Sequence, residues 1–341
     1  MRKTNAWTNR VICATLLACL AACTNDEKIP TVDEILAVEK GRIHAFLDGK
    51  SYSCFPYEGT DYYGHPLRDT LYVMNNDTTG TRPADKQFVL VDYDEMALNG
   101  SYIASTDPAR FVGEGIATPY PVGGPLYYPM HLSGATPAPL SVALREMSEG
   151  TTGDMLLPST LAGRPAGDYF YARFKIWRVI PDLLEYEKSL IRAYVDTLKL
   201  TQGVTDADIF TKKSTTGDSI VHLFITHCKE ETGDSVVTSS RVKIAHALYL
   251  LNEAELASPP DCLKRKVGER LENNPGSFPT SGLMALFPGM SYLKKGDEAT
   301  LIIPHNYAYK DSGTFDSITE EIRIPPYSTL VYRLKIVDVV K

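Results

Sequence analysis

The sequence is poor in cysteine and has no concentrated positive charge. Its 341 residues include six cysteines, and Lys and Arg are outnumbered by Asp and Glu, 35 against 42. The formal net charge is −7, and no block of five or more Lys or Arg occurs. An acidic chain without a basic stripe is unsuited to nucleic acid and to anionic lipid surfaces. We therefore predict that nucleic acid is not a partner.

Motifs for covalent and metal chemistry are also missing. No Ser-His-Asp order, paired-carboxylate motif or phosphate-binding loop stands out in the sequence. Beyond residue 23 the cysteines are Cys54, Cys228 and Cys262, an odd number with no short spacing, which does not indicate a disulfide framework or a metal site. His227 and Cys228 are neighbours and would point to opposite faces of a strand. We predict no metal and no cofactor.

An apolar run long enough to cross a bilayer is missing from the N-terminus. A basic segment, residues 1–10, precedes an apolar run over residues 11–20 that is too short for a permanent membrane helix. The sequence Leu20-Ala21-Ala22-Cys23 follows, which is typical of a bacterial lipoprotein signal. We predict a signal peptide over 1–22, with Cys23 as the lipidation site. An uncleaved anchor and ordinary secretion are the alternatives.

The residues after Cys23 indicate where such a lipoprotein would reside. Thr24-Asn25-Asp26-Glu27 resembles the surface-export signal of Bacteroidetes lipoproteins. Cleavage before Cys23 removes three positive charges and no negative ones, so the formal charge moves from −7 to −10. A cysteine carrying several acyl chains, palmitate among them, anchors stably. We predict an outer-membrane lipoprotein of the cell envelope and leave the periplasmic and surface-exposed faces both open.

What the sequence does contain is an internal duplication. The stretch 39–48 recurs at 187–196 with five of ten positions identical, an offset of 148. The apolar spacing in each stretch predicts an amphipathic helix at the start of each copy. Downstream, Arg173–Ile180 parallels Arg333–Val340.

A third block repeats between these two. Gly150 and Pro158 stand eight residues apart, as do Gly296 and Pro304, at an offset of 146. A period near 147 is that of a domain rather than a solenoid repeat. We predict a linker over 23–32 and then two domains, bounded as 33–183 and 184–341.

The second copy ends in a pattern of several short motifs in one order. These are the KKGDEATLIIP run from Lys294, the Ala308-Tyr309 pair, Ile324-Pro325-Pro326, and Thr329-Leu330-Val331-Tyr332. The pattern resembles the C-terminal half of an FKBP-type peptidyl-prolyl cis-trans isomerase domain. The resemblance implies an α+β fold in each copy, an antiparallel sheet curled over a short helix. We expect the Gly-, Pro- and Asp-rich segments 49–86, 107–138 and 259–280 to be long loops or insertions.

The resemblance also implies a site. Prolyl isomerisation needs no nucleophile, metal or cofactor, but a dry, aromatic-lined cavity that favours the twisted imide. In the second copy Tyr309 matches the family's hydroxyl donor and Ile324 the isoleucine before the paired prolines. Tyr332 matches the aromatic residue of the last strand, and Leu283 the tryptophan of the pocket floor. Alternatively, these four are ordinary core and loop residues of the scaffold.

The second copy departs from the family pattern at several positions. The family's Phe-Asp pair, whose carboxylate faces the pocket, has become Leu256-Ala257. Pro279 falls where a backbone donor is expected, and proline cannot donate. Lys310 stands where the family has glycine.

The first copy departs further. The Phe-Asp pair has become Ile103-Ala104, Ala162 is followed by Gly163 instead of tyrosine, and Ala172 replaces the last-strand aromatic. We expect the first copy to be a structural or partner-binding domain.

Two functions of different classes stay open at this point. The first is a prolyl isomerase or folding factor that acts on proline-containing polypeptides. The second is a non-catalytic lipoprotein that uses the same scaffold to hold a protein partner. A module of a glycan or peptide uptake system is a third reading.

Overall fold

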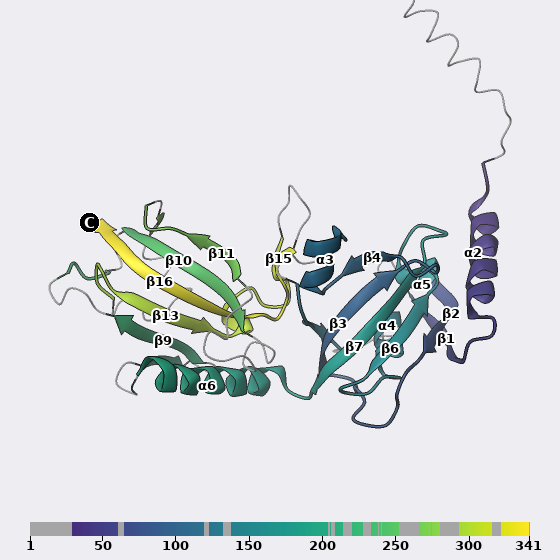
Figure 1. Ribbon diagram of the computed structural model, residues 1–341, viewed down its shortest axis with the longest axis horizontal. Helices are drawn as coiled ribbons and strands as arrows, with labels where there is room; N and C mark the ends of the chain where they lie inside the picture. Colours follow the sequence, from purple (N-terminus) through teal and green to yellow (C-terminus); the bar gives the residue numbers. More distant parts are fainter. Residues whose placement is uncertain are drawn as a thin grey trace, which may run out of the picture.

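The protein consists mainly of two antiparallel sheets, each preceded by a helix (Figure 1). This computed structural model describes residues 29–60, 65–118, 123–131, 138–203, 205, 209–213, 220–227, 233–237, 239, 241–251, 266–273, 275–279, 293–315 and 322–340. The predicted α+β class with antiparallel sheets is confirmed. Among the described residues, no helix combines the length and apolarity needed to cross a membrane.

The first sheet has seven strands, and its order is β1-β2-β6-β7-β3-β4, with β5 paired to β3. The strands are β1 Tyr52–Thr60, β2 Pro66–Met74, β3 Phe88–Met96, β4 Tyr102–Ser105, β5 Leu126–Pro129, β6 Thr152–Leu157 and β7 Phe170–Ile180. The helices around it are α2 Val32–Leu47, α3 Pro108–Glu114, α4 Pro139–Leu144 and α5 Ser159–Ala162.

The second sheet also has seven strands, in the order β11-β10-β16-β13-β9-β8, with β12 paired to β10. The strands are β8 Ile209–Lys213, β9 Ile220–His227, β10 Arg241–Leu251, β11 Lys266–Arg270, β12 Gly276–Pro279, β13 Glu298–Ile303 and β16 Thr329–Val340. Helix α6 Leu183–Gln202 precedes this sheet, and the 3₁₀ helix η3 His305–Tyr307 follows β13. The hairpin of β14 Thr314–Phe315 and β15 Ile322–Ile324 completes the described elements.

The two sheets share one strand order, which makes the duplication visible in the topology. Read from one edge, β1-β2-β6-β7-β3-β4 corresponds to β8-β9-β13-β16-β10-β11, and the side strands β5 and β12 correspond as well. The repeated blocks of sequence fall on β6 and β13 and on β7 and β16. The domain boundaries 33–183 and 184–341 stay a prediction, although no strand is shared between the two described sheets.

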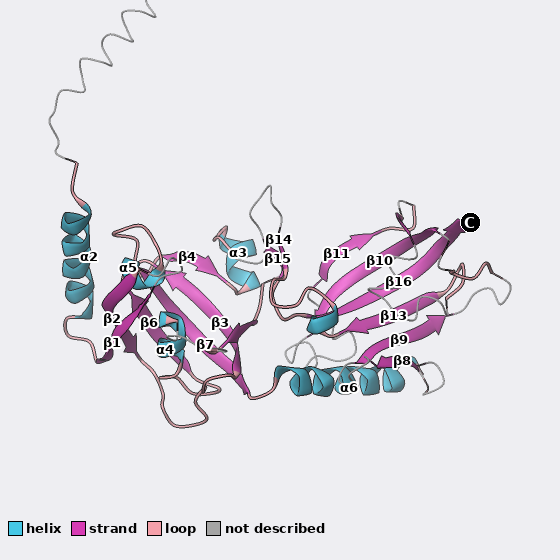
Figure 2. Ribbon diagram, turned by 180° about the vertical axis from the view of Figure 1, so that it is seen from behind, coloured by secondary structure: helices cyan, strands magenta, loops and turns pink. Residues whose placement is uncertain are grey.

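Each sheet buries both of its faces. Successive side chains of a strand point to opposite faces, and the central strands carry apolar residues on both. In the second sheet, Leu301 and Leu330 belong to one core cluster. Their neighbours Ile302 and Val331 pack instead against α6. We call the side that carries Leu301 and Leu330, and its counterpart in the first sheet, the inner face. The opposite side is the helix face, covered by α2 in the first sheet and by α6 in the second (Figure 2).

The two covering helices begin at side-chain caps. The Thr31 hydroxyl accepts from the Glu34 backbone N–H, and the Glu34 carboxylate accepts from the Thr31 backbone N–H, which forms a capping box for α2. Asp182 caps α6 by accepting from the Glu185 backbone N–H. Amphipathic helices at the start of each copy were predicted, and α2 and α6 confirm them.

The sheet-over-helix arrangement is described for the first domain. Ala143 and Leu144 of α4 are fully buried against inner-face residues of β2, β3, β6 and β7. In the second domain, residues 280–292, which include the predicted pocket-floor residue Leu283, lie outside the described residues.

The prediction of long loops at 49–86, 107–138 and 259–280 is wrong in large part. The first segment contains the hairpin β1–β2, the second contains α3 and β5, and the third contains β11 and β12. Apart from β2, these strands lie at an edge or at the side of a sheet, and β1 has mostly exposed residues. An edge strand tolerates proline and polar residues, so its composition resembles that of a loop.

Candidate functional site

The candidate site lies on the inner face of the second sheet, at the end of β13 and the start of β16. Tyr332 of β16 lies opposite Leu248 of β10 and Leu301 of β13 in the two ladders. It is half-buried and packs on the core that contains Ile324. Tyr309 follows η3 and is 41% exposed. The structure thus brings together three of the four predicted residues, while Leu283 lies outside the described part.

The two tyrosines are hydrogen-bonded to each other. Burial raises the pKa of the Tyr332 phenol well above its ordinary value of 10.0, and the charge and the hydrogen bond of Tyr309 raise it further. A phenol hydroxyl can both donate and accept, so either tyrosine can be the donor of this bond. Tyr309 is the more exposed of the two, so its hydroxyl is the one that a ligand can reach.

Ile324 lies in the hydrophobic core beside Tyr332. It is only 4% exposed and belongs to the same core cluster as Leu330. Its backbone N–H donates to the Thr314 hydroxyl at 3.0 Å, within the β14–β15 hairpin. Ile324 therefore supports the apolar floor beside Tyr332.

His246 is a residue of this face that the sequence analysis did not identify. It lies on β10 two residues from Ile244 and from Leu248, which point to the inner face. Its ring centroid is 5.7 Å from that of Tyr332. The period-two pattern of β10 placed it on the inner face, but only the ladder between β10 and β16 brings it next to Tyr332.

The loop that carries Tyr309 has left-handed backbone at two residues other than glycine. Lys310 has φ +54° and Tyr327 has φ +61°. Lys310 occupies the position where the family has glycine, and glycine adopts positive φ without a steric penalty. The Tyr327 N–H donates to the Lys310 carbonyl at 2.7 Å, which ties the two residues together.

A buried carboxylate of α6 holds this loop by hydrogen bonds. Glu187 of α6 is fully buried and accepts from the backbone N–H of His305 at 2.9 Å and from the Thr329 hydroxyl at 2.5 Å. Its second oxygen contacts the His305 ring. Because His305 begins η3 and Thr329 begins β16, this one side chain links α6 to both segments of the site.

The first domain has the same anchor. Glu39 of α2, the counterpart of Glu187 in the repeat, accepts from the Ser159 N–H and hydroxyl, both at 2.6 Å, and from the Gly167 N–H at 2.9 Å. The sequence comparison aligned Glu39 with Glu187 but did not predict this function. A glutamate inside an amphipathic helix normally faces solvent, so no local pattern revealed it.

The inner face of the first domain carries other chemistry. Tyr93 stacks on Phe174 at 5.3 Å between centroids and lies 6.4 Å from Phe170. Arg164 makes a two-pronged ion pair with Glu95, at 2.6 and 3.1 Å. Hydrogen bonding to Glu95 raises the pKa of the Arg164 guanidinium above its ordinary value. Rings and a salt bridge fill the place where the second domain has its tyrosine pair.

The other positions at which the sequence differs from the family pattern lie outside the tyrosine pair. Ala172, which stands in place of the last-strand aromatic, is fully buried on β7. Ile103 of β4 is 48% exposed, so it does not contribute a wall of a pocket. Pro279 ends β12 and lies opposite Arg241. Leu256 and Ala257 are outside the described residues.

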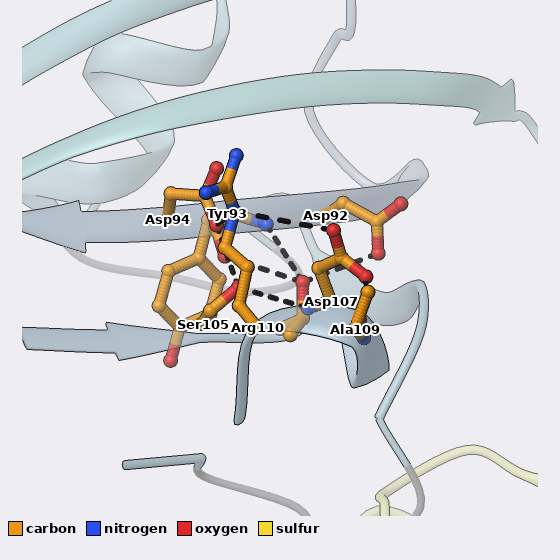
Figure 3. A network of polar contacts seen from close by, with 8 residues as sticks. Asp92, Tyr93, Asp94, Ser105, Asp107, Ala109 and Arg110 are labelled. Atoms are coloured by element: carbon orange, nitrogen blue, oxygen red, sulfur yellow. Dashed lines mark hydrogen bonds and ion pairs between the residues drawn. The ribbon is translucent and has the colours of Figure 1, made fainter. Parts of the chain in front are cut away.

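Carboxylates near β4 are engaged in a local network (Figure 3). The Ser105 hydroxyl donates to Asp94 at 2.6 Å, and Arg110 lies 3.3 Å from the same carboxylate. Asp107 caps α3 by accepting from the Ala109 N–H at 2.9 Å. These acids hold β3, β4 and α3 together. In the described part of the chain, no group of three or more His, Cys, Asp or Glu side chains is placed to hold a metal ion.

With this geometry established, comparison with known proteins identifies the segment. Residues 276–337 match the family model of the FKBP-type peptidyl-prolyl cis-trans isomerases. The predicted resemblance is confirmed. The matched segment spans β12 to β16 and contains Tyr309, Ile324 and Tyr332. No curated protein sequence matches the chain.

Solved structures of FKBP proteins are also found. FkpA from Escherichia coli aligns at 20% identity and TM-score 0.27, over 46% of this chain and 63% of that one. The three FKBP domains of wheat FKBP73 align at 13% identity and TM-score 0.28, over 80% and 95%. The N-terminal domain of FKBP42 from Arabidopsis thaliana aligns at 17% identity and TM-score 0.29, over 41% and 100%.

Proposed function

We propose that this protein is an FKBP-like peptidyl-prolyl cis-trans isomerase or folding factor of the cell envelope, with its site in the second domain. The observation that carries the proposal is the hydrogen-bonded pair of Tyr309 and Tyr332 beside an apolar core, inside the segment that matches the isomerase family. Proline-containing polypeptides are the proposed substrates.

The arrangement suits a reaction that needs desolvation and one well-placed donor. Rotation about an X-Pro bond meets a barrier of about 18–20 kcal/mol in water. Twisting the imide removes its resonance and its charge separation, so an apolar environment favours the twisted state over the planar one. Because Tyr309 is 41% exposed, its hydroxyl can donate to the carbonyl of a bound substrate. The buried side of Tyr332 and the core around Ile324 supply the apolar wall.

A second function is favoured by the first domain. Its inner face is closed by the Tyr93–Phe174 stack and by the Arg164–Glu95 pair, and it has Ala172 where the second domain has Tyr332. A duplicated scaffold with one such domain suits a non-catalytic lipoprotein that holds a protein partner. For the whole chain, this is the alternative proposal.

The cellular context is part of the proposal. A lipid on Cys23 would hold both domains at the outer membrane, on the periplasmic or the surface-exposed face. Two features of the sequence support it, the Leu20-Ala21-Ala22-Cys23 motif and the acidic residues that follow. Metabolic labelling of wild type and of Cys23→Ala with a palmitate analogue tests it, and label in the variant would contradict the proposal.

Catalysis is tested by NMR exchange between the cis and trans forms of a proline peptide, with the soluble fragment 24–341. We expect the wild type to accelerate exchange. Tyr309→Phe removes one donor and should lower kcat/KM about tenfold, which corresponds to about 1.4 kcal/mol. Adding Ile324→Ala should lower it further.

The matched control is Tyr93→Phe, which removes one phenol from the inner face of the first domain and should leave the rate unchanged. Absence of acceleration by the wild type would overturn catalysis and favour the binding function. Ala257→Asp then restores a carboxylate at the position where the family has one. A gain of activity in that variant would show that the scaffold is competent and lacks only this group.

A further inference from the structure

The two domains meet in an apolar, aromatic seam. Only Pro181 and Asp182 separate the end of β7 from the start of α6, so the second domain begins directly beside the first. Leu90, Ile180 and Leu183 form a buried cluster there. Four aromatic residues from both domains pack on this cluster: Phe88, Tyr127, Tyr186 and Tyr327.

The seam is closely packed where the start of β5 meets the end of β10 and the Pro325–Ser328 segment. The cavity between these segments has a volume of about 10 Å³. Beside this contact, Ile180, Pro181 and Tyr186 line an open groove of about 810 Å³. Where the domains pack closely, a change on one side is transmitted as a packing change.

Tyr327 is the strained member of the seam. Its φ of +61° is a left-handed conformation that an aromatic residue rarely adopts. Such conformations persist where surrounding contacts hold them, and they are concentrated at functional sites. Here the Tyr327 ring lies edge-on to Phe88 of the first domain, with centroids 4.9 Å apart and planes at 72°. The centroid of the Tyr327 ring also lies 5.6 Å from that of His305 in the second domain.

From Tyr327 the contacts lead directly to the loop of the candidate site. The Tyr327 N–H donates to the Lys310 carbonyl at 2.7 Å, and the Lys310 N–H donates to the His305 carbonyl at 2.9 Å. Tyr309 lies between these two anchors in the chain. His305 is held in turn by Glu187 of α6. The Tyr309 backbone is thus fixed by α6 at one end and by Tyr327 at the other.

We propose that the first domain is a built-in brace for the site of the second, and that Phe88 and Tyr327 are its positioning residues. The Phe88 ring holds Tyr327 in its left-handed conformation, and Tyr327 holds Lys310 and thereby the neighbouring Tyr309. The first domain then contributes to prolyl-peptide recognition without contacting the peptide. This inference rests on the proposed function, but the claim that Phe88 and Tyr327 hold Lys310 in place can be tested without a catalytic assay.

The test uses hydrogen–deuterium exchange of the Lys310 and Tyr327 amides in the full two-domain protein, together with kcat/KM for the proline peptide. Phe88→Ala should speed exchange of both amides about three- to tenfold, because one aromatic pair is lost. It should lower kcat/KM by a similar factor. Phe88→Tyr keeps the ring and should restore both quantities.

The matched control is Tyr52→Ala. Tyr52 and Tyr72 form an edge-on pair in the first domain with the same interplanar angle of 72°, at 5.8 Å, on the hairpin of β1 and β2. This variant loses an equivalent pair away from the seam and should leave the Lys310 and Tyr327 amides unchanged.

Unchanged exchange in Phe88→Ala, or an equal change in Tyr52→Ala, overturns the brace. If Phe88→Ala does not fold, the contact is tested by changing Tyr327 instead. Tyr327→Phe keeps the ring and Tyr327→Ala removes it, so the Lys310 amide should exchange faster in Tyr327→Ala. Equal exchange of the Lys310 amide in these two variants overturns the brace. If the wild type does not catalyse isomerisation but Phe88→Ala loosens the two amides, the brace is supported and only the proposed catalysis fails.

Discussion

The inner faces of the two domains differ although the scaffolds correspond strand for strand. In the first, Tyr93 stacks on Phe174, and Arg164 pairs with Glu95. In the second, Tyr332 and Tyr309 form a hydrogen-bonded pair beside a hydrophobic core. The same strand order therefore accommodates two different inner faces. One is filled by aromatic rings and a salt bridge, and the other carries two tyrosine hydroxyls.

What both domains retain is the anchor between the leading helix and the loop after β6 or β13. Glu39 and Glu187 are both buried and both accept from backbone and side-chain donors of that loop. A buried carboxylate is costly unless its oxygens are hydrogen-bonded. Its presence in both copies shows that attachment of the helix is a property of the scaffold, and the chemistry of the loop is what differs.

The largest expected effect comes from removing these anchors. Glu187→Ala leaves the His305 N–H and the Thr329 hydroxyl buried without their acceptor, which should cost about 3 kcal/mol of unfolding free energy. Since η3 also positions Tyr309, the variant should lose most of its kcat/KM for the proline peptide. Urea unfolding and the exchange assay measure the two effects.

Glu39→Ala is the matched variant in the first domain. It should lower unfolding free energy by a similar amount with a much smaller loss of turnover. Equal losses of turnover in the two variants would contradict the assignment of the site to the second domain.

A smaller effect is expected from opening the first domain's inner face. Arg164→Ala leaves the buried Glu95 without its cation, at a cost of about 2 kcal/mol, less than for a wholly buried pair because Arg164 is partly exposed. Replacing both residues by leucine should recover most of this loss. Urea unfolding of the single and double variants measures it, and turnover should stay at the wild-type level in both. A double variant no more stable than Arg164→Ala would show that the pair is not what closes this face.

The last expected effect is a loss of stability at alkaline pH, which grows as the pH rises. The pKa of Tyr332 is raised by burial above its ordinary 10.0, so its ionisation is suppressed in the folded protein. Its contribution is fully present below about pH 10 and declines above it, by up to about 1.4 kcal/mol per pH unit. Tyr332→Phe should flatten this decline in urea unfolding measured from pH 9 to 12.

Tyr171 provides the comparison in the first domain. Burial and the neighbouring Asp154 raise its pKa to about 12, so its effect falls in the window from pH 10 to 12. Tyr171→Phe should reduce the alkaline decline less than Tyr332→Phe does. The opposite ranking would show that Tyr332 is more accessible to water than the packing around it indicates.

Strong local patterns predicted the central parts of both sheets. Three features of the sequence carry such patterns: a candidate strand over Arg241–Leu251, a hairpin-type turn at Asn99-Gly100, and alternation of apolar residues in the last strand. They correspond to β10, the β3–β4 connection and β16. In these segments one face of the strand is buried, so the spacing of apolar residues along the sequence indicates a strand. The edge strands β1 and β11 were missed because exposed strands carry polar residues and leave no such record.

The candidate site was predictable only in part. Tyr309, Ile324 and Tyr332 were found because they belong to a recognisable run of motifs. His246 and Glu187 were not, because each acts on a partner far away in the chain: His246 on Tyr332, and Glu187 on His305 and Thr329. Sequence position within a helix or strand does not reveal a partner more than 80 residues away.

By itself, the sequence determined that the chain is acidic, duplicated and built of antiparallel strands, and that its last segment is FKBP-like. The tertiary structure decided which residues meet: Tyr332 with Tyr309, Glu187 with the site loop, and Tyr327 with Phe88 across the seam. The physical reason is that periodicity and short motifs are local properties. Hydrogen bonds to a buried carboxylate and a ring packed between two domains arise only when distant strands are brought into register.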